Sequence, residues 1–282
     1  MQIKFENISM PDGKLLRYAH TEGVEAPKAV VQFIHGFGEH CDSYAEIMKF
    51  FAKKNIASII HDQRGHGVMP GVAPEERAVL LGLLPAYSLF TSDLKIIAQK
   101  ARQIYGSLPL ILYGHSMGGN IALNSFEGYS RVILESPWIR LYKTPSLITR
   151  IIAKVLGGIS YKIAIDTKLV KNHISRDKEQ VKKIEEDPLF HTRISLRLFG
   201  QVSAAGINAL NSASRLNIPV FLLCASNDKI VCPKAIRELA SKIPVEHLTF
   251  KEYEDAYHAL RKDIIGKEVM SDVANYILNS LG

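Results

Sequence analysis

The sequence predicts an α/β fold in which a mostly parallel central sheet carries helices on both faces and is interrupted by a helical cap. Apolar runs rich in β-branched residues alternate with amphipathic stretches, a pattern typical of parallel strands joined by helical crossovers. The alternation stops between residues 137 and 203 and then resumes. In this chain of 282 residues we therefore expect a core domain made of residues 1–136 and 204–282, with residues 137–203 inserted as a cap or lid.

The expected elements follow from local patterns. The first twenty residues predict two short strands around the turn Pro11-Asp12-Gly13. Buried strands are expected at the apolar runs 29–35, 56–61, 108–114, 131–136 and 219–226, and a further strand is expected at about 246–252. Helices are expected at 42–53, from 91 or 92 to about 105, directly after Ser116, at about 233–242 and at about 262–280. Residues 63–88 are expected to form a loop, because glycines and prolines recur there.

The composition narrows the class of protein. Apolar residues make up 47% and charged residues 22% of the chain, as in globular domains, and no apolar run reaches transmembrane length. The formal net charge of +7 comes from scattered Lys and Arg without a basic run, so we expect no nucleic-acid binding. Attraction to an anionic membrane surface stays open, and so does the oligomeric state.

Cysteine usage and the N-terminus bear on location. Cys41, Cys224 and Cys232 suggest neither a disulfide framework nor a metal site. The N-terminal residues have no apolar core or cleavage signature of a secretory signal. We therefore expect reduced thiols, no metal and a cytoplasmic location.

A Gly-x-Ser-x-Gly pentapeptide spans residues 114–118, between a predicted strand and a predicted helix. A sharp turn at this corner strains the serine backbone, and the flanking glycines leave room for it. Ser116 is thereby presented above the sheet as a candidate nucleophile. A glycine-rich turn without chemistry is the alternative interpretation.

A serine hydroxyl needs a general base, and the base needs a carboxylate that fixes its tautomer. His258 lies in a polar stretch between the last strand and the last helix, where a loop can hang over the nucleophile. Asp228 follows the strand at 219–226, again at a carboxyl end. Asp255 and Glu254 are rivals, but they lie too close in sequence to reach around the ring easily. The chain order Ser116, Asp228, His258 is the one expected for a nucleophile of this type.

Two backbone N–H groups are expected to stabilise the oxyanion that such chemistry forms. Met117 follows the nucleophile directly, and Phe37 lies between two glycines in the loop after the strand at 29–35. The motif at residues 62–67, Asp-Gln-Arg-Gly-His-Gly, is expected to brace neighbouring loops by hydrogen bonds rather than to take part in chemistry.

Taken together, five motifs resemble the monoacylglycerol lipase and lysophospholipase branch of the α/β hydrolases, the serine aminopeptidase S33 grouping. They span almost the whole chain in the expected order: HGFGEH (35–40), DQRGHG (62–67), GHSMGGNIAL (114–123), SNDKIV (226–231) and YH (257–258). The resemblance implies the α/β-hydrolase fold and the same triad and oxyanion residues. It also implies that the Glu39 carboxylate supports the end of the pocket that holds the polar head.

The insertion is expected to bind the substrate and to select it. Residues 145–156 place Leu147, Ile151 and other apolar residues over about half of a helix circumference. Such a helix either packs on the core or forms an apolar roof over an acyl chain that can also touch a lipid surface. Trp138, at the start of the insertion, is expected to line the same pocket.

These observations predict a serine hydrolase that cleaves carboxylic esters through an acyl-enzyme, without a cofactor. A monoacylglycerol or lysophospholipid is the expected small-molecule substrate. A short-chain or aryl carboxylesterase, a thioesterase or a peptidase would use the same triad. A relative that only binds or scaffolds is disfavoured, because such proteins usually lose a triad member and all three are present here.

Overall fold

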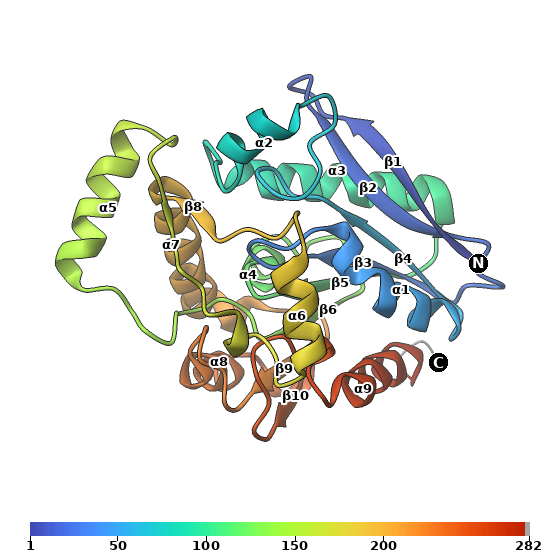
Figure 1. The fold of residues 1–282 in the computed structure, drawn as a ribbon. Helices are drawn as coiled ribbons and strands as arrows, with labels where there is room; N and C mark the ends of the chain where they lie inside the picture. The colour runs from blue at the N-terminus through green and yellow to red at the C-terminus, as the bar shows by residue number, and fades with distance from the viewer. Residues whose placement is uncertain (280–282) are drawn as a thin grey trace.

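The computed structural model describes residues 1–279, except for the side chains of Leu147 and Arg150. Its centre is a sheet of eight strands in the order β1-β2-β4-β3-β5-β6-β9-β10. Strand β2 runs antiparallel to β1 and to β4, and the remaining neighbours pair in parallel (Figure 1). The predicted α/β architecture, with its mostly parallel sheet, is confirmed.

The strands agree closely with the apolar runs. Their bounds are β1 Gln2–Ser9, β2 Leu15–Glu22, β3 Ala29–Ile34, β4 Ile56–His61, β5 Leu110–His115, β6 Arg131–Glu135, β9 Val220–Ala225 and β10 Leu248–Tyr253. Every residue of β3, β4, β5 and β9 is buried. This burial explains why these four strands are mostly apolar rather than alternating.

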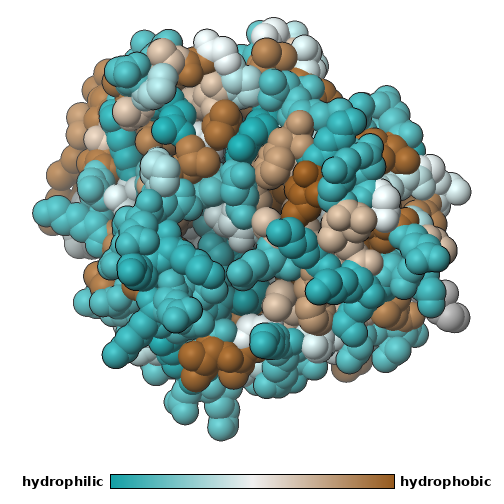
Figure 2. Space-filling view, turned by 45° about the vertical axis from the view of Figure 1, so that its right-hand side comes forward, coloured by the Kyte–Doolittle hydropathy of each residue, from teal (hydrophilic) through white to brown (hydrophobic). Residues whose placement is uncertain are grey.

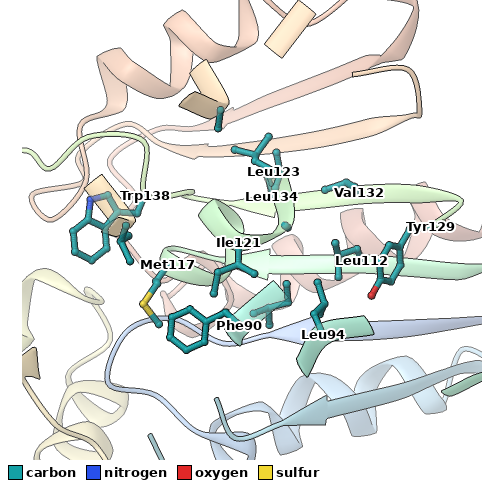
Figure 3. Packing of buried hydrophobic residues seen from close by; sticks show 14 of the residues in the cluster. Phe90, Leu94, Leu112, Met117, Ile121, Leu123, Tyr129, Val132, Leu134 and Trp138 are labelled. Atoms are coloured by element: carbon teal, nitrogen blue, oxygen red, sulfur yellow. The ribbon is translucent and has the colours of Figure 1, made fainter. Parts of the chain in front are cut away.

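Helices cover both faces of the sheet. The core helices are α1 Ala45–Ala52, α3 Ser88–Tyr105, α4 Met117–Leu123, α8 Pro233–Ala240 and α9 Gly266–Asn279. Successive strand residues point to opposite faces, so Val30 joins the apolar cluster under α3, α4 and α8, while Val31 joins the cluster under α1 and α9. Figure 3 shows the first cluster, in which the side chains of Met117 and Phe90 lie next to each other.

The segment between β4 and α3 differs from its prediction as a continuous loop. It contains α2, Pro74–Leu80, which begins with proline and buries none of its residues. A helix without an apolar stripe leaves no periodic signal in the sequence. Helix α3 also begins before residue 91, because the backbone N–H of Tyr87 donates to the side chain of Gln201 (2.8 Å). This contact is made across the fold, so no local pattern could indicate it.

Besides a short 3-10 helix at Lys171–His173, the predicted cap region contains five elements, and its division from the core stays a prediction. They are α5 Leu147–Ile159, β7 Ala164–Asp166, α6 Lys178–Glu186, β8 Arg193–Ser195 and α7 Leu196–Ser212, which continues past residue 203. In Figure 1, α7 lies between α5 and the central sheet. Within the described residues, no helix is long and apolar enough to cross a membrane. Hydrophilic residues predominate on the face drawn in Figure 2.

Helix α5 is held against α7 by a close backbone approach. A Cβ atom at Gly157 would lie 2.7 Å from the backbone nitrogen of Arg197. The Arg197 guanidinium in turn donates to the carbonyl oxygens of Gly157 (2.7 Å) and Gly158 (2.9 Å), which satisfies groups at the end of α5. A Cβ atom at Gly158 would meet nothing within 4 Å.

This difference predicts opposite effects for two neighbouring substitutions. Gly158→Ala should raise the free energy of unfolding by up to about 1 kcal/mol, because alanine favours the helix and has space there. Gly157→Ala should lower it by about 1–3 kcal/mol, because the added methyl overlaps backbone. Urea denaturation followed by circular dichroism measures both. Equal effects of the two substitutions would contradict the described packing of α5 on α7.

Candidate active site

Ser116 occupies a strained corner between β5 and α4. Its backbone has φ 53° and ψ −115°, a conformation that costs energy for any residue with a side chain. The corner is held because the Ser116 N–H donates to the Glu135 carbonyl (3.0 Å) and the Ser116 carbonyl accepts from Trp138 N–H (2.9 Å). A Cβ atom at Gly114 or at Gly118 would overlap the surrounding backbone. The glycine spacing of the pentapeptide is therefore a packing requirement.

His258 and Asp228 meet at the same edge of the sheet. The Nδ1 atom of His258 lies 2.6 Å from Oδ2 of Asp228, and both residues are buried. The other oxygen of Asp228 accepts from the N–H groups of Ile230 (2.7 Å) and Val231 (2.9 Å), which fixes the carboxylate. A proton on Nδ1 leaves Nε2 of His258 with a free lone pair, as a general base requires.

The residue that precedes Ser116 contacts His258. The imidazole of His115, which precedes Ser116, has its ring centroid 4.9 Å from that of His258. Ser116, Asp228 and His258 each follow the carboxyl end of a parallel strand, namely β5, β9 and β10. The rival Asp255 is exposed, with φ 56°.

The two backbone groups expected to hold an oxyanion lie at neighbouring turns. Gly118 packs so closely on the carbonyl of Ile34 that the start of α4 abuts the end of β3. Met117 is the first residue of α4, where N–H groups have no acceptor within the helix. Phe37 lies in the turn after β3, and within residues 1–279 no hydrogen bond uses its N–H.

A buried group of charges lies beside these loops, and the sequence interpretation missed most of it. Arg261 donates to Glu39 (2.7 Å) and to Glu135 (3.1 Å), and Lys262 also donates to Glu39 (3.1 Å). Burial alone would raise the pKa of the Glu39 carboxyl, but the charges of Arg261 and Lys262 hold it well below its usual range. Burial lowers the pKa of His115, which keeps that imidazole neutral. Two features of the sequence could have indicated this group. Glu135 lies at the end of a predicted strand, and the basic residues Arg261 and Lys262 follow soon after His258.

The motif at residues 62–67 braces the loops, as its pattern suggests. The Asp62 carboxylate accepts from the N–H groups of Cys41 (2.7 Å) and Val68 (3.0 Å). Arg64 donates to the buried Asp93 through Nε (2.6 Å) and a terminal nitrogen (2.9 Å).

The residues expected to contact the substrate have different surroundings in the part of the chain that the structure describes. Trp138, labelled in Figure 3, is only 6% exposed and lies in the core cluster. Its ring centroid lies 6.1 Å from that of Phe199. Ile151 is 53% exposed on α5. The side chain of Leu147 lies outside the described residues. Glu39 is buried among protein donors.

The predicted cap touches the loop that carries Phe37. The backbone N–H of His191 donates to the Gly38 carbonyl (3.3 Å). The Phe37 ring lies edge-on to the imidazoles of His191 (5.4 Å) and His66 (5.9 Å). Burial lowers the pKa of His66 to about 4, so the imidazole that contacts Phe37 from this side is uncharged at neutral pH.

His40 fastens the core to the segment after α6. Its Nε2 lies 2.6 Å from Asp187 and its Nδ1 lies 3.1 Å from Asp42. Burial alone would lower the pKa of His40, but the hydrogen bonds to the two carboxylates raise it above its usual value. A pocket of about 220 Å³ beside this contact is lined by His40 and Asp187, and neither Ser116 nor His258 lines it.

The raised pKa of His40 predicts that its contacts with Asp42 and Asp187 contribute to the free energy of unfolding in a pH-dependent way. The protonated imidazole stabilises the fold fully below its unfolded pKa of about 6.5, and this contribution is lost as the pH rises through the higher folded-state pKa. His40→Gln should therefore destabilise the protein most in mild acid and progressively less towards alkaline pH. Urea midpoints of wild type and variant across this range measure the difference. A gap that widens with rising pH would contradict the described ion pairs.

Several known proteins resemble the chain over most of its length. A putative monoglyceride lipase from Schizosaccharomyces pombe is 28% identical over 85% of this chain and 64% of its own length. Monoglyceride lipase from Rattus norvegicus is 29% identical over 96% of this chain and 86% of its own length. An uncharacterized abhydrolase domain-containing protein from Dictyostelium discoideum is 29% identical over 89% of this chain. The chain spans only 26% of that protein's length.

The fold also matches solved structures. A soluble variant of monoglyceride lipase from Saccharomyces cerevisiae, in complex with a substrate analogue, aligns with a TM-score of 0.84 at 24% identity. The alignment covers 98% of this chain and 94% of that one, which establishes the α/β-hydrolase fold. The sequence pattern of the serine aminopeptidase S33 family matches residues 25–264. Because this match covers most of the chain, the chain belongs to the serine aminopeptidase S33 family.

Proposed function

We propose that this protein is a serine hydrolase that cleaves carboxylic esters, with a monoacylglycerol-type substrate. The observation that carries the proposal is the 2.6 Å contact between His258 and a fixed Asp228 at the sheet edge where the strained Ser116 lies. Membership of the serine aminopeptidase S33 family supports a serine nucleophile. The relatives named monoglyceride lipases support the substrate class.

In the proposed reaction, the Ser116 hydroxyl attacks the ester carbonyl while Nε2 of His258 takes its proton. Asp228 stabilises the imidazolium that forms. The N–H groups of Met117 and Phe37 bind the oxygen that becomes negatively charged. The tetrahedral intermediate then collapses, the C–O bond to the alcohol breaks, and His258 returns the proton to the leaving alcohol. Water repeats the sequence on the acyl-enzyme, which frees the carboxylic acid and restores Ser116.

Removal of the nucleophile tests this mechanism. Ser116→Ala should lower hydrolysis of p-nitrophenyl and monoacylglycerol esters by at least about a thousandfold, because no other group can form the acyl-enzyme. An unchanged urea midpoint would show that the fold persists.

Wild-type rates across a series of acyl lengths complete the test. Turnover by Ser116→Ala at the wild-type rate would overturn the mechanism. A preference of the wild type for acetyl over long-chain esters would instead favour a short-chain carboxylesterase.

We further propose that α5 contacts an anionic lipid surface. The helix leaves a row of apolar side chains exposed, namely Ile148, Ile151, Ile152, Val155 and Ile159. Water-exposed apolar groups of this extent favour burial in a lipid interface. Exposed lysines in the same part of the chain add attraction to anionic head groups, namely Lys143, Lys154, Lys162 and Lys168.

A cytoplasmic location is proposed as well, supported by three free cysteines.

Polar substitutions on α5 test the lipid contact. The double variant Ile148→Ser/Ile152→Ser should bind vesicles containing phosphatidylglycerol at least about tenfold more weakly, because two apolar side chains lose their burial. Its turnover of a soluble ester should stay at the wild-type level. Val245→Ser is a matched control, since Val245 is 85% exposed just before β10. Undiminished vesicle binding by the double variant would overturn the proposal for α5.

A further inference from the structure

Glu39 connects three segments of the candidate site through one of its two carboxylate oxygens. Its Oε2 accepts from the Gly36 N–H (2.8 Å) and the Tyr44 hydroxyl (3.1 Å), and it lies 3.1 Å from Nδ1 of His115. Because an ionised carboxylate only accepts hydrogen bonds, the proton on His115 sits on Nδ1. The carboxylate therefore joins the loop that carries Phe37 to the strand that ends at the nucleophile.

The second oxygen joins these segments to the loop that carries His258. Its Oε1 accepts from Arg261 (2.7 Å) and Lys262 (3.1 Å). Arg261 lies three residues after His258, and its backbone N–H donates to Glu135 at the end of β6 (3.0 Å). The position of the His258 loop thus depends on the same carboxylate as the turn that carries Phe37.

The space around Glu39 is already filled by protein. A carboxylate has about four lone-pair sites, and Glu39 has five donors within hydrogen-bond distance. The residue is 4% exposed. A Cβ atom at Gly36 would lie only 2.8 Å from Nδ1 of His115 and 3.0 Å from Oε2 of Glu39. No acceptor capacity is left for the hydroxyl groups of a substrate.

We propose that Glu39 is a positioning residue that sets the spacing of the oxyanion loop, the nucleophile strand and the His258 loop, and does not recognise the polar head of the substrate. The inference rests on the proposed function, because it assigns Glu39 a role in that same reaction. It replaces the head-group role that the family resemblance implied. A residue of this kind acts on every substrate alike, since it alters the reacting groups and not the fit of the alcohol.

Glu39→Gln separates the two roles. The amide keeps the size of the side chain but turns an N–H₂ group towards one set of donors and leaves the Arg261 charge underneutralised. We expect kcat to fall by about 10- to 100-fold for p-nitrophenyl acetate and for a monoacylglycerol alike, with little change in KM. The rate of Ser116 labelling by a fluorophosphonate, which has no glycerol head, should fall by a similar factor.

A selective effect would overturn the proposal. If Glu39 contacted the head group, KM would rise for the monoacylglycerol alone, and p-nitrophenyl acetate turnover and fluorophosphonate labelling would stay at wild-type levels. Failure of the wild-type protein to label at Ser116 would overturn the proposed function and this inference with it. Wild-type labelling combined with a head-selective loss in the variant would overturn this inference alone.

Two further variants keep the test decisive. Asp93→Asn is the matched control, because Asp93 is also a buried carboxylate bound by an arginine, Arg64, and it does not touch the candidate site. It should lower the unfolding midpoint while leaving kcat and labelling unchanged. If Glu39→Gln does not fold, Tyr44→Phe removes a single donor from Glu39. A uniform loss of several-fold across both substrates would support positioning, and a loss confined to the monoacylglycerol would contradict it.

Discussion

The close approach of α4 to β3 is the constraint on which the candidate site depends. Any side chain at Gly118 would overlap the carbonyl of Ile34, so only glycine fits at this second position of α4. Ser116 adopts its strained conformation directly before this helix, where backbone hydrogen bonds to Glu135 and Trp138 hold it. Local backbone strain is therefore maintained by the surrounding sheet, where it can serve chemistry.

A group of buried charges lies close to this corner. Glu39, Glu135 and Arg261 are buried, and each links a different loop or strand end. Isolated charges would be costly in such a place, but opposite charges with matched hydrogen bonds are tolerated and define a unique arrangement. The His258 loop thus gains a fixed anchor that the Asp228 contact alone would not supply.

The sheet was predictable because strands buried on both faces are continuously apolar, as in β3 and β4. The positions of Ser116, Asp228 and His258 after strand ends were predictable because glycine spacing and chain order are local signals. Three features of the structure could not be predicted from the sequence. Helix α2 has no apolar stripe, the start of α3 depends on a contact with Gln201, and the partners of Glu39 are up to 223 residues away in the chain. The outward orientation of Ile151 also depends on how α5 meets α7, which periodicity alone cannot specify.

In the proposed mechanism, Ser116 carries the acyl group during turnover. Acid quenching of the wild-type protein during hydrolysis of a long-chain p-nitrophenyl ester, followed by peptide mass spectrometry, tests this claim directly. We expect one added acyl mass on the peptide that contains Ser116, and loss of that mass on further incubation. An ester hydrolysed without any acylated Ser116 peptide, or an acyl group found on another residue, would contradict it.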